Sequence, residues 1–443
     1  MIIKALKKIW FLSLLLVFFS CSNDDNEELF NETPSTRIDQ RISELQNLLL
    51  ASPDGYRAIY FTKDDEYGGF TFYMKFNSDG TVEMTSDVDS ETAITSSRYE
   101  VKMGTTTELL FSTRNHIHKV SDSNIPGLIG SGYEGNSNFM YIKNEGGNIT
   151  FIEPRNEATI VFEPVNAGDW ANVNTSLARR SSLLPSVTSS VFQALTIEDT
   201  SGNKTFYTFE YDPLRLFANS VNQAADGTIS EISYGIAYTP DGLVVSPSIQ
   251  VGDNAYENFT FDEMSKSYIS DIGGNKASIG FLDEPTFISN DFQDLGNDFD
   301  SFLYAPADGT SPLTSLGFDA LVEELNTNMT PFGLTFNLFA VFITVDGDST
   351  LLIRFVDGTG AALDLRYTLK TSIKDKKIFF EDVTPNDGNS AFLATQMEPL
   401  TNFWASTEGL YYNNTGNYFQ FIDQSGTFTS AQNPALRIYG LWF

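Results

Sequence analysis

The two histidines of the chain, His116 and His118, are separated by one residue and are candidates for holding a metal ion. Side chains two residues apart on a β-strand share a face, so both imidazoles would lie together there and offer ligands that zinc accepts. Any of many carboxylates could be the third ligand, so this spacing does not define a site. The alternative, a polar pair on a solvent-facing strand, is favoured, and we predict no metal and no cofactor.

Two acidic segments could bind calcium through carboxylate oxygens. They are Asp64-Asp65-Glu66 and the aspartate-rich segment 291–300. Neither follows the calcium-loop pattern Asp-x-Asp-x-Asp-Gly with a distal glutamate. Solvated surface loops are therefore the favoured interpretation of both.

Nucleophilic catalysis needs an activated serine or cysteine beside a base. The chain has one cysteine and two histidines, and it contains no Gly-x-Ser-x-Gly, His-Glu-x-x-His, P-loop or dinucleotide-binding glycine motif. We therefore predict a protein that is not an enzyme. Hydrolysis of extracellular glycans stays open as an alternative, because it needs only two suitably separated carboxylates and the chain has 58 acidic residues.

Aromatic side chains are the remaining candidates for ligand binding, since sugar rings stack on the faces of Trp and Tyr. The residues that could form such a platform are Trp170, Trp404, Trp442, Tyr411, Tyr412 and Tyr418. The 37 phenylalanines mostly alternate within predicted strands, which is typical of a core. A core position is favoured for any single aromatic residue, so no ligand-binding residue is assigned.

Cys21, the one cysteine, follows a secretory signal. Lysines 4, 7 and 8 precede an apolar run at residues 9–19 that is too short to span a bilayer comfortably. The position of Cys21 after this run resembles that of the lipidated cysteine of bacterial lipoproteins, which implies a signal peptide at 1–20 and an acylated mature N-terminus. Phe18-Phe19-Ser20 is bulkier than the usual residues before that cysteine. The alternative is a plain cleaved signal with an incidental cysteine.

Residues 21–34 form a polar and acidic stretch that cannot bury itself, so we expect an extended tether. A short acidic run directly after the lipidated cysteine resembles the export signal of Bacteroidetes lipoproteins. It implies an outer-membrane location facing the cell exterior, whereas a bare charge run would mean only solvation. The net charge of −31 argues against nucleic acid as a partner.

The body of the chain is predicted to be α+β and predominantly antiparallel, with sandwich-like or open-barrel-like sheets and a few short helices. A helix that ends near Leu49 is expected, with Thr33 or Ser35 as its cap, and a hairpin is expected from Phe76 to Val82. Further helices are expected near 315–325 and 390–404. A pause in the pattern at 282–285 indicates two β-rich domains, 35–285 and 286–443.

Several segments resemble the domain-of-unknown-function 4302 lipoproteins of Bacteroidetes, most closely over residues 25–165. They are LFNETPSTRI (29–38), SPDGY (52–56), GGF (68–70), KFNSDGTV (75–82), LLFSTRN (109–115) followed by His118, and GIAYTPDGL (235–243). That family has no assigned activity. The resemblance implies a setting beside a TonB-dependent transporter and its nutrient-binding lipoprotein.

We therefore expect a lipid-anchored, non-catalytic accessory protein that captures glycan or peptide nutrients, and the resemblance alone implies that it does so beside such a transporter. The alternatives are a carboxylate-based glycan hydrolase and a purely structural partner of the transporter complex. Two acids facing each other across an aromatic cleft would favour the hydrolase. An exposed apolar patch without a pocket would favour the structural partner.

Overall fold

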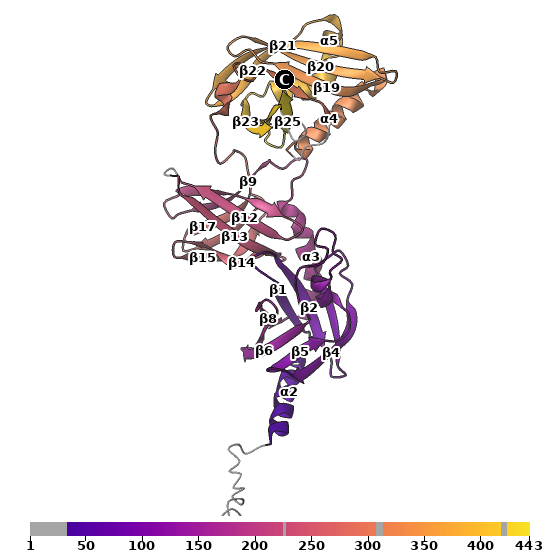
Figure 1. The fold of residues 1–443 in the computed structure, drawn as a ribbon, viewed down its shortest axis with the longest axis vertical. Helices are drawn as coiled ribbons and strands as arrows, with labels where there is room; N and C mark the ends of the chain where they lie inside the picture. Colours follow the sequence, from indigo (N-terminus) through magenta and orange to yellow (C-terminus); the bar gives the residue numbers. More distant parts are fainter. Residues whose placement is uncertain (1–32, 225–226, 307–312, 418–422) are drawn as a thin grey trace, which may run out of the picture.

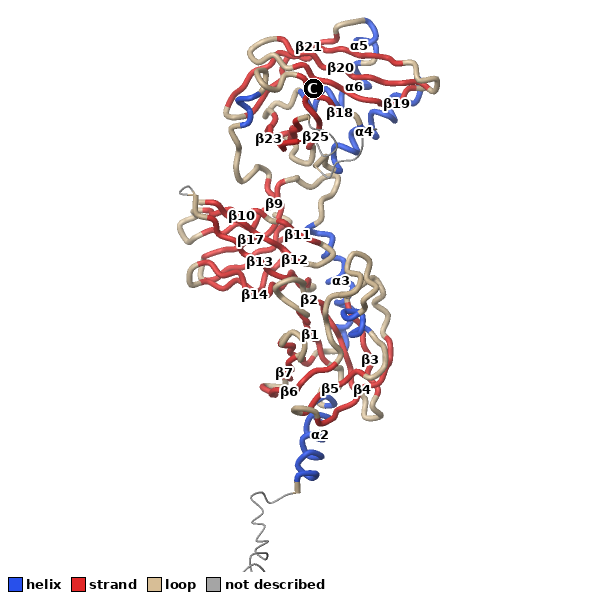
Figure 2. The backbone as a smooth tube through the Cα atoms, in the orientation of Figure 1, coloured by secondary structure: helices blue, strands red, loops and turns tan. Residues whose placement is uncertain are grey.

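The protein, studied as a computed structural model, is described at residues 33–224, 227–306, 313–417 and 423–443. Three antiparallel sheets follow one another along the chain. Figure 1 shows them stacked along the longest axis, with α2 (Pro34–Leu50) at one end and the last sheet at the other. Figure 2 shows that strands make up most of each unit and that helices are few. This confirms the predicted α+β, mainly antiparallel class.

The first sheet closes on itself, and we call it the N-terminal barrel. Each strand pairs with the next, and β1 also pairs with β8 to close the circle. The strands are β1 (Tyr56–Phe61), β2 (Gly69–Phe76), β3 (Thr81–Ser86), β4 (Thr95–Met103), β5 (Thr107–Phe111), β6 (Asn138–Glu145), β7 (Asn148–Ile152) and β8 (Thr159–Pro164).

Helix α2, which the sequence predicts, packs against the core of the N-terminal barrel, and Thr33 is the one of its two candidate caps that is used. The Thr33 hydroxyl accepts a hydrogen bond from the backbone N–H of Thr36 (3.3 Å), which satisfies one of the free donors of the first turn. Leu45 and Leu49 on one face are fully buried in the barrel core. The Tyr56 hydroxyl donates to the carbonyl of Leu48 (2.5 Å), so the end of the helix is also tied to the first strand.

The second sheet is open and has nine strands, and we call it the central sheet. Its order is β10-β9-β17-β16-β15-β14-β13-β12-β11, so β9 pairs with β17 although the two are far apart in the sequence. The strands are β9 (Phe192–Glu198), β10 (Lys204–Thr208), β11 (Glu210–Asp212), β12 (Phe217–Gln223), β13 (Ile229–Tyr238), β14 (Gly242–Val251), β15 (Asn254–Asp262), β16 (Ser267–Ile272) and β17 (Asn275–Leu282).

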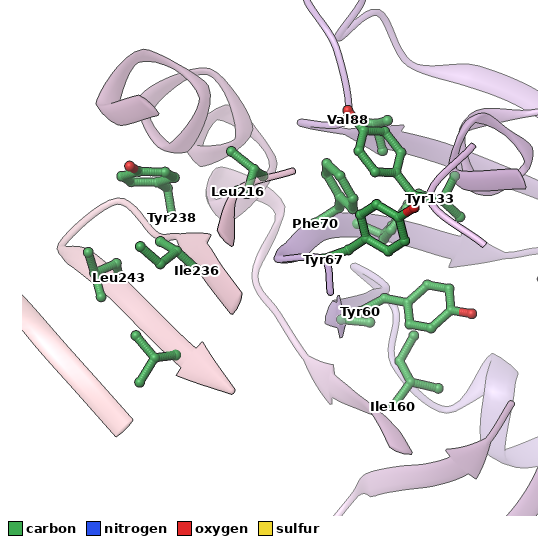
Figure 3. Packing of buried hydrophobic residues seen from close by; sticks show 14 of the residues in the cluster. Tyr60, Tyr67, Phe70, Val88, Tyr133, Ile160, Leu216, Ile236, Tyr238 and Leu243 are labelled. Atoms are coloured by element: carbon green, nitrogen blue, oxygen red, sulfur yellow. The ribbon is translucent and has the colours of Figure 1, made fainter. Parts of the chain in front are cut away.

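The N-terminal barrel and the central sheet share one hydrophobic core. Figure 3 shows Tyr67 and Phe70 of the barrel side near Leu216 and Ile236 of the sheet side. The backbones also touch, because the Gly68 N–H donates to the carbonyl of Arg215 (2.7 Å). A Cβ on Gly68 would lie 2.4 Å from the carbonyl oxygens of Leu216 and Ile236, so only glycine fits at this junction.

Replacing Gly68 with alanine should therefore destabilise this junction. We expect Gly68→Ala to lower the free energy of unfolding by about 1–3 kcal/mol, the usual cost of overpacking. Gly168→Ala is the matched control, because a Cβ added there would meet no atom within 4 Å and its backbone is unstrained. Thermal unfolding followed by circular dichroism measures both, and equal melting temperatures would contradict the close packing at Gly68.

The third sheet is a second closed circle of eight strands, which we call the C-terminal barrel; β18 pairs with β25 to close it. Its strands are β18 (Ser301–Tyr304), β19 (Leu334–Phe342), β20 (Asp348–Asp357), β21 (Ala362–Lys374), β22 (Lys377–Pro385), β23 (Leu410–Asn417), β24 (Gln424–Ser430) and β25 (Arg437–Trp442).

The C-terminal barrel has a core of its own, separate from the shared core. Helix α4 (Leu316–Met329), capped by Ser315, and helices α5 (Gly388–Phe392) and α6 (Ala394–Trp404) confirm the two helical regions expected in this half. Trp404, the last residue of α6, is fully buried at the centre of this core. Five phenylalanine rings lie within 6.3 Å of its ring: Phe302, Phe339, Phe380, Phe403 and Phe428.

The predicted boundary at 285/286 falls between β17, the last strand of the central sheet, and β18, the first of the C-terminal barrel. The range 35–285 contains two sheets around one core, and 286–443 contains the other core. Within the described ranges, no helix is both long and apolar enough to cross a membrane.

Candidate functional site

His116 lines an open cleft on the flank of the N-terminal barrel, which we call the histidine cleft, whereas His118 does not line it. Its volume is about 420 Å³. The segment after β3 contributes one wall, and the short 3₁₀ helix η1 (His116–Ser121) with the loop after it contributes another. Asp89, Glu91, Arg114, His116, Lys119 and Asp122 provide its charged and imidazole groups.

The expectation that His116 and His118 share a strand face is wrong. The Asn115 side chain accepts from the Ile117 N–H (3.2 Å), and the Asn115 N–H donates to Nδ1 of His118 (3.2 Å). This reciprocal capping winds the segment into a 3₁₀ helix, in which residues two apart point to different sides. The two imidazoles therefore cannot form the metal pair that a strand would provide.

His116 is instead tied to a serine. Its Nε2 lies 2.8 Å from the carbonyl oxygen of Ala93, which can only accept, so Nε2 carries the proton and Nδ1 accepts from the Ser86 hydroxyl (3.1 Å). This resembles the contact between a nucleophile and its base. Ser86 is fully buried, however, and burial lowers the pKa of His116. The contact therefore fastens η1 to β3, since substrate cannot reach the hydroxyl.

Each charged side chain of the histidine cleft has an oppositely charged partner. Lys119 Nζ lies 2.7 Å from Asp89 and 3.4 Å from Glu91. Arg114 pairs with Asp122 at 2.5 Å. Backbone N–H donation from Asn124, together with Arg114, lowers the pKa of Asp122. A glycosidase acid needs a carboxyl whose pKa is raised, so Asp122 does not suit that role.

The two acidic segments are held by contacts with other parts of the chain, and the second begins with the short 3₁₀ helix η4 (Asp291–Asp294). Asp64 accepts from the Ser246 hydroxyl (2.7 Å), and Glu66 pairs with Lys63 (2.7 Å) and Arg215 (3.0 Å). In the second segment, Asp291 accepts from the Asn414 N–H (2.9 Å). Among the residues that the structure describes, no three side chains of the metal-ligating types come together.

The aromatic candidates that the structure describes do not form a sugar-binding platform. Trp404, Trp442 and Tyr412 belong to the core of the C-terminal barrel. Tyr411 is also buried, and Trp170 lies apart on the N-terminal barrel, where its indole N–H donates to the carbonyl of Asp54 (2.9 Å). Tyr418 and Cys21 both lie outside the described residues, so the lipidation of Cys21 stays a prediction.

A second hollow of about 600 Å³ lies where the central sheet meets the C-terminal barrel, and we call it the junction cleft. Its walls come from segment 184–193, the start of α4, Phe281 at the end of β17 and Arg437 at the start of β25. None of these residues was among the candidates named from the sequence. The two clefts are thus built from different parts of the chain.

Comparisons with known proteins give a family but no activity. The search of curated proteins finds no match. A solved structure of the DNA polymerase sliding clamp from Pseudomonas aeruginosa aligns over 91% of this chain and 97% of its own, with 10% identity and a TM-score of 0.18. That score is too low to carry any argument about fold or function. The model of the family "Domain of unknown function (DUF4302)" matches residues 26–263, more than half of the chain, and the protein therefore belongs to the DUF4302 family.

Proposed function

We propose that this protein is a lipoprotein of the outer membrane, anchored through Cys21 and facing the cell exterior, that captures nutrients beside a TonB-dependent transporter. The observation that carries the proposal is the order of the units along the long axis. Helix α2 lies at one end and the C-terminal barrel at the other (Figure 1). A lipid attached before α2 would hold the junction cleft away from the membrane, where a ligand can reach it.

The clefts support binding in preference to catalysis. In the histidine cleft, the charged side chains are paired and the serine beside His116 is buried. The alternative of a glycan hydrolase requires two carboxyl groups of different pKa facing each other. Asp87 does have a raised pKa, of about 6, but its side chain is only 1% exposed and cannot meet a glycan.

A structural partner of the transporter complex is the second candidate, favoured by an aromatic pair on the C-terminal barrel. Phe332 and Phe392 are 42% and 74% exposed, and their rings lie 6.2 Å apart. Exposed apolar patches often mark protein contacts. Phe392→Ser would weaken recovery of the transporter if this pair contacts it.

Removing the thiol of residue 21 should release the protein from the membrane. We expect Cys21→Ala to abolish incorporation of labelled palmitate and to move the chain to the soluble fraction, because several acyl chains are needed for stable anchoring. Ser22→Ala keeps the thiol and is the matched control. Label retained in Cys21→Ala would show that the anchor is elsewhere.

The accessory role is tested by affinity purification of the tagged chain from native outer membranes, followed by mass spectrometry. We expect a TonB-dependent transporter and its lipoprotein partner to co-purify with the wild type. The Cys21→Ala chain serves as the control for adventitious capture. Recovery of neither partner with the wild type would contradict the accessory role.

A further inference from the structure

The junction cleft exists only because two units meet. The Val191 N–H donates to the carbonyl of Pro434 (3.0 Å), and the rings of Phe192 and Tyr411 lie 5.9 Å apart. These contacts join the start of β9 to the C-terminal barrel beside the cleft. Its volume of about 600 Å³ falls within the range of about 300–1,000 Å³ that is usual for small-ligand sites.

Arg437 supplies a positive charge that no carboxylate of the described residues neutralises. Its Nε donates to the carbonyl of Leu313 (2.6 Å), whereas no carboxylate of the described chain lies within ion-pair distance of its guanidinium. Burial lowers the pKa of Arg437, which reflects the loss of water around the charge. Arg437 is therefore able to receive an anion, and its planar fork suits a carboxylate.

Asp319, in the first turn of α4, supplies the complementary negative charge. No cation among the described residues pairs with its carboxylate, and burial raises its pKa. The rest of the lining is apolar or carries hydroxyl and amide groups, with no further charge. One cation and one anion thus line the same cleft without pairing with each other, in contrast to the paired charges of the histidine cleft.

We propose that the junction cleft binds a short apolar peptide with free ends, its α-carboxylate on Arg437 and its ammonium on Asp319. Leu184, Val191 and Phe281 provide apolar surface for its side chains. The inference rests on the proposed role in nutrient capture and narrows the ligand to peptides. Glycans fit less well, because Trp404, Trp442 and Tyr412 are buried in the barrel core.

Isothermal titration of the purified full-length chain with leucyl-alanyl-leucine tests the inference. We expect the free tripeptide to bind, and its C-terminal amide to bind about tenfold more weakly or worse, as for loss of a charge-assisted hydrogen bond. Arg437→Gln should cause a similar loss, and it should weaken the amide little further because both changes remove the same contact. Acetylation of the peptide's N-terminus and the substitution Asp319→Asn should each weaken binding in the same way. Combining the two should weaken binding little further, because both remove the same contact.

The matched controls are Arg366→Gln and Glu381→Gln, which alter charges of the same barrel outside the cleft. Both should bind the tripeptide as the wild type does. No binding of the free tripeptide, equal binding of the blocked peptides, or equal losses in Arg437→Gln and Arg366→Gln would each overturn the inference. The amidated and acetylated peptides are tested on the wild-type protein, so this comparison stays informative even if a variant fails to fold.

The tripeptide-binding test and the transporter-recovery test can succeed or fail independently. A chain that recovers the transporter but binds no free tripeptide overturns the peptide inference and leaves the accessory role standing. A chain that binds the tripeptide through Arg437 but recovers no transporter supports the inference and overturns the accessory role.

Discussion

Trp404→Ala is expected to lower the free energy of unfolding of the C-terminal barrel by about 3–5 kcal/mol, as for other large aromatic residues truncated in a core. Trp404 is fully buried and meets five phenylalanine rings, so its removal leaves a cavity that all of them border. The shared core of the N-terminal barrel and the central sheet contains none of these residues. Its unfolding should therefore change little.

Denaturant titration followed by circular dichroism measures this effect. We expect two unfolding transitions, one for each core, and only that of the C-terminal barrel should shift. Trp404→Phe is the matched control. It keeps most of the ring volume and removes an indole N–H that has no partner among the described residues, so its loss should be much smaller. An alanine variant that unfolds at the wild-type midpoint would show that Trp404 does not organise this core.

Arg180→Met is the second substitution with a large expected effect. Arg180 Nη2 lies 3.3 Å from the carboxylate of Asp87, and the two side chains are 19% and 1% exposed. Removing one partner of a buried ion pair leaves the other charge uncompensated, which costs about 3–5 kcal/mol. The more exposed pair Arg354–Asp364, whose side chains are 39% and 26% exposed, provides the control, since Arg354→Met should cost only about 0–1 kcal/mol.

The loss in free energy of unfolding caused by Arg180→Met should depend on pH. Burial raises the pKa of Asp87 from 3.8 to about 6, against the opposing effect of Arg180. Between these values the folded chain holds a proton that the unfolded chain has lost, so this group reduces stability as pH rises from about 4 to 6. Above pH 6 the folded carboxylate is charged and needs Arg180.

The difference in stability between the wild type and Arg180→Met should therefore be largest near pH 8 and should shrink below pH 6. Urea unfolding at pH 5 and pH 8 measures it. The tyrosines near Arg180, Tyr133, Tyr211 and Tyr238, stay neutral over this range because burial raises the pKa of each. A loss that is the same at both pH values would contradict the ionisation of Asp87.

Local sequence signals predicted the helices and turns whose formation depends on residues close together in the sequence. Thr33, one of the two predicted caps, precedes α2, and the glycine-containing turn between Phe76 and Val82 joins β2 to β3. Both follow from backbone hydrogen bonds and turn geometry within a few residues. The closure of two barrels did not follow from the sequence, because the pairings of β1 with β8 and of β18 with β25 join distant segments.

The candidate sites were harder to predict from the sequence, because they depend even more on contacts between distant residues. A histidine two residues from another fits a strand or a 3₁₀ helix, and the side chain of Asn115 decided between them. Ser86 meets His116, which lies 30 positions further along the chain, and no local pattern reveals such a contact. For the junction cleft the sequence holds one signal, since Arg437 is the single charged residue in the apolar stretch 435–443.

The pairing of β9 with β17 bears on how the chain can reach its folded state during synthesis. The family match ends at residue 263, before β16 and β17, yet β17 lies between β9 and the rest of the central sheet. Until residue 282 has emerged, the edge of β9 that β17 later covers has no partner strand. Such an edge can pair with another chain. A fragment cut at the family boundary should therefore aggregate, and one extended to residue 282 should not.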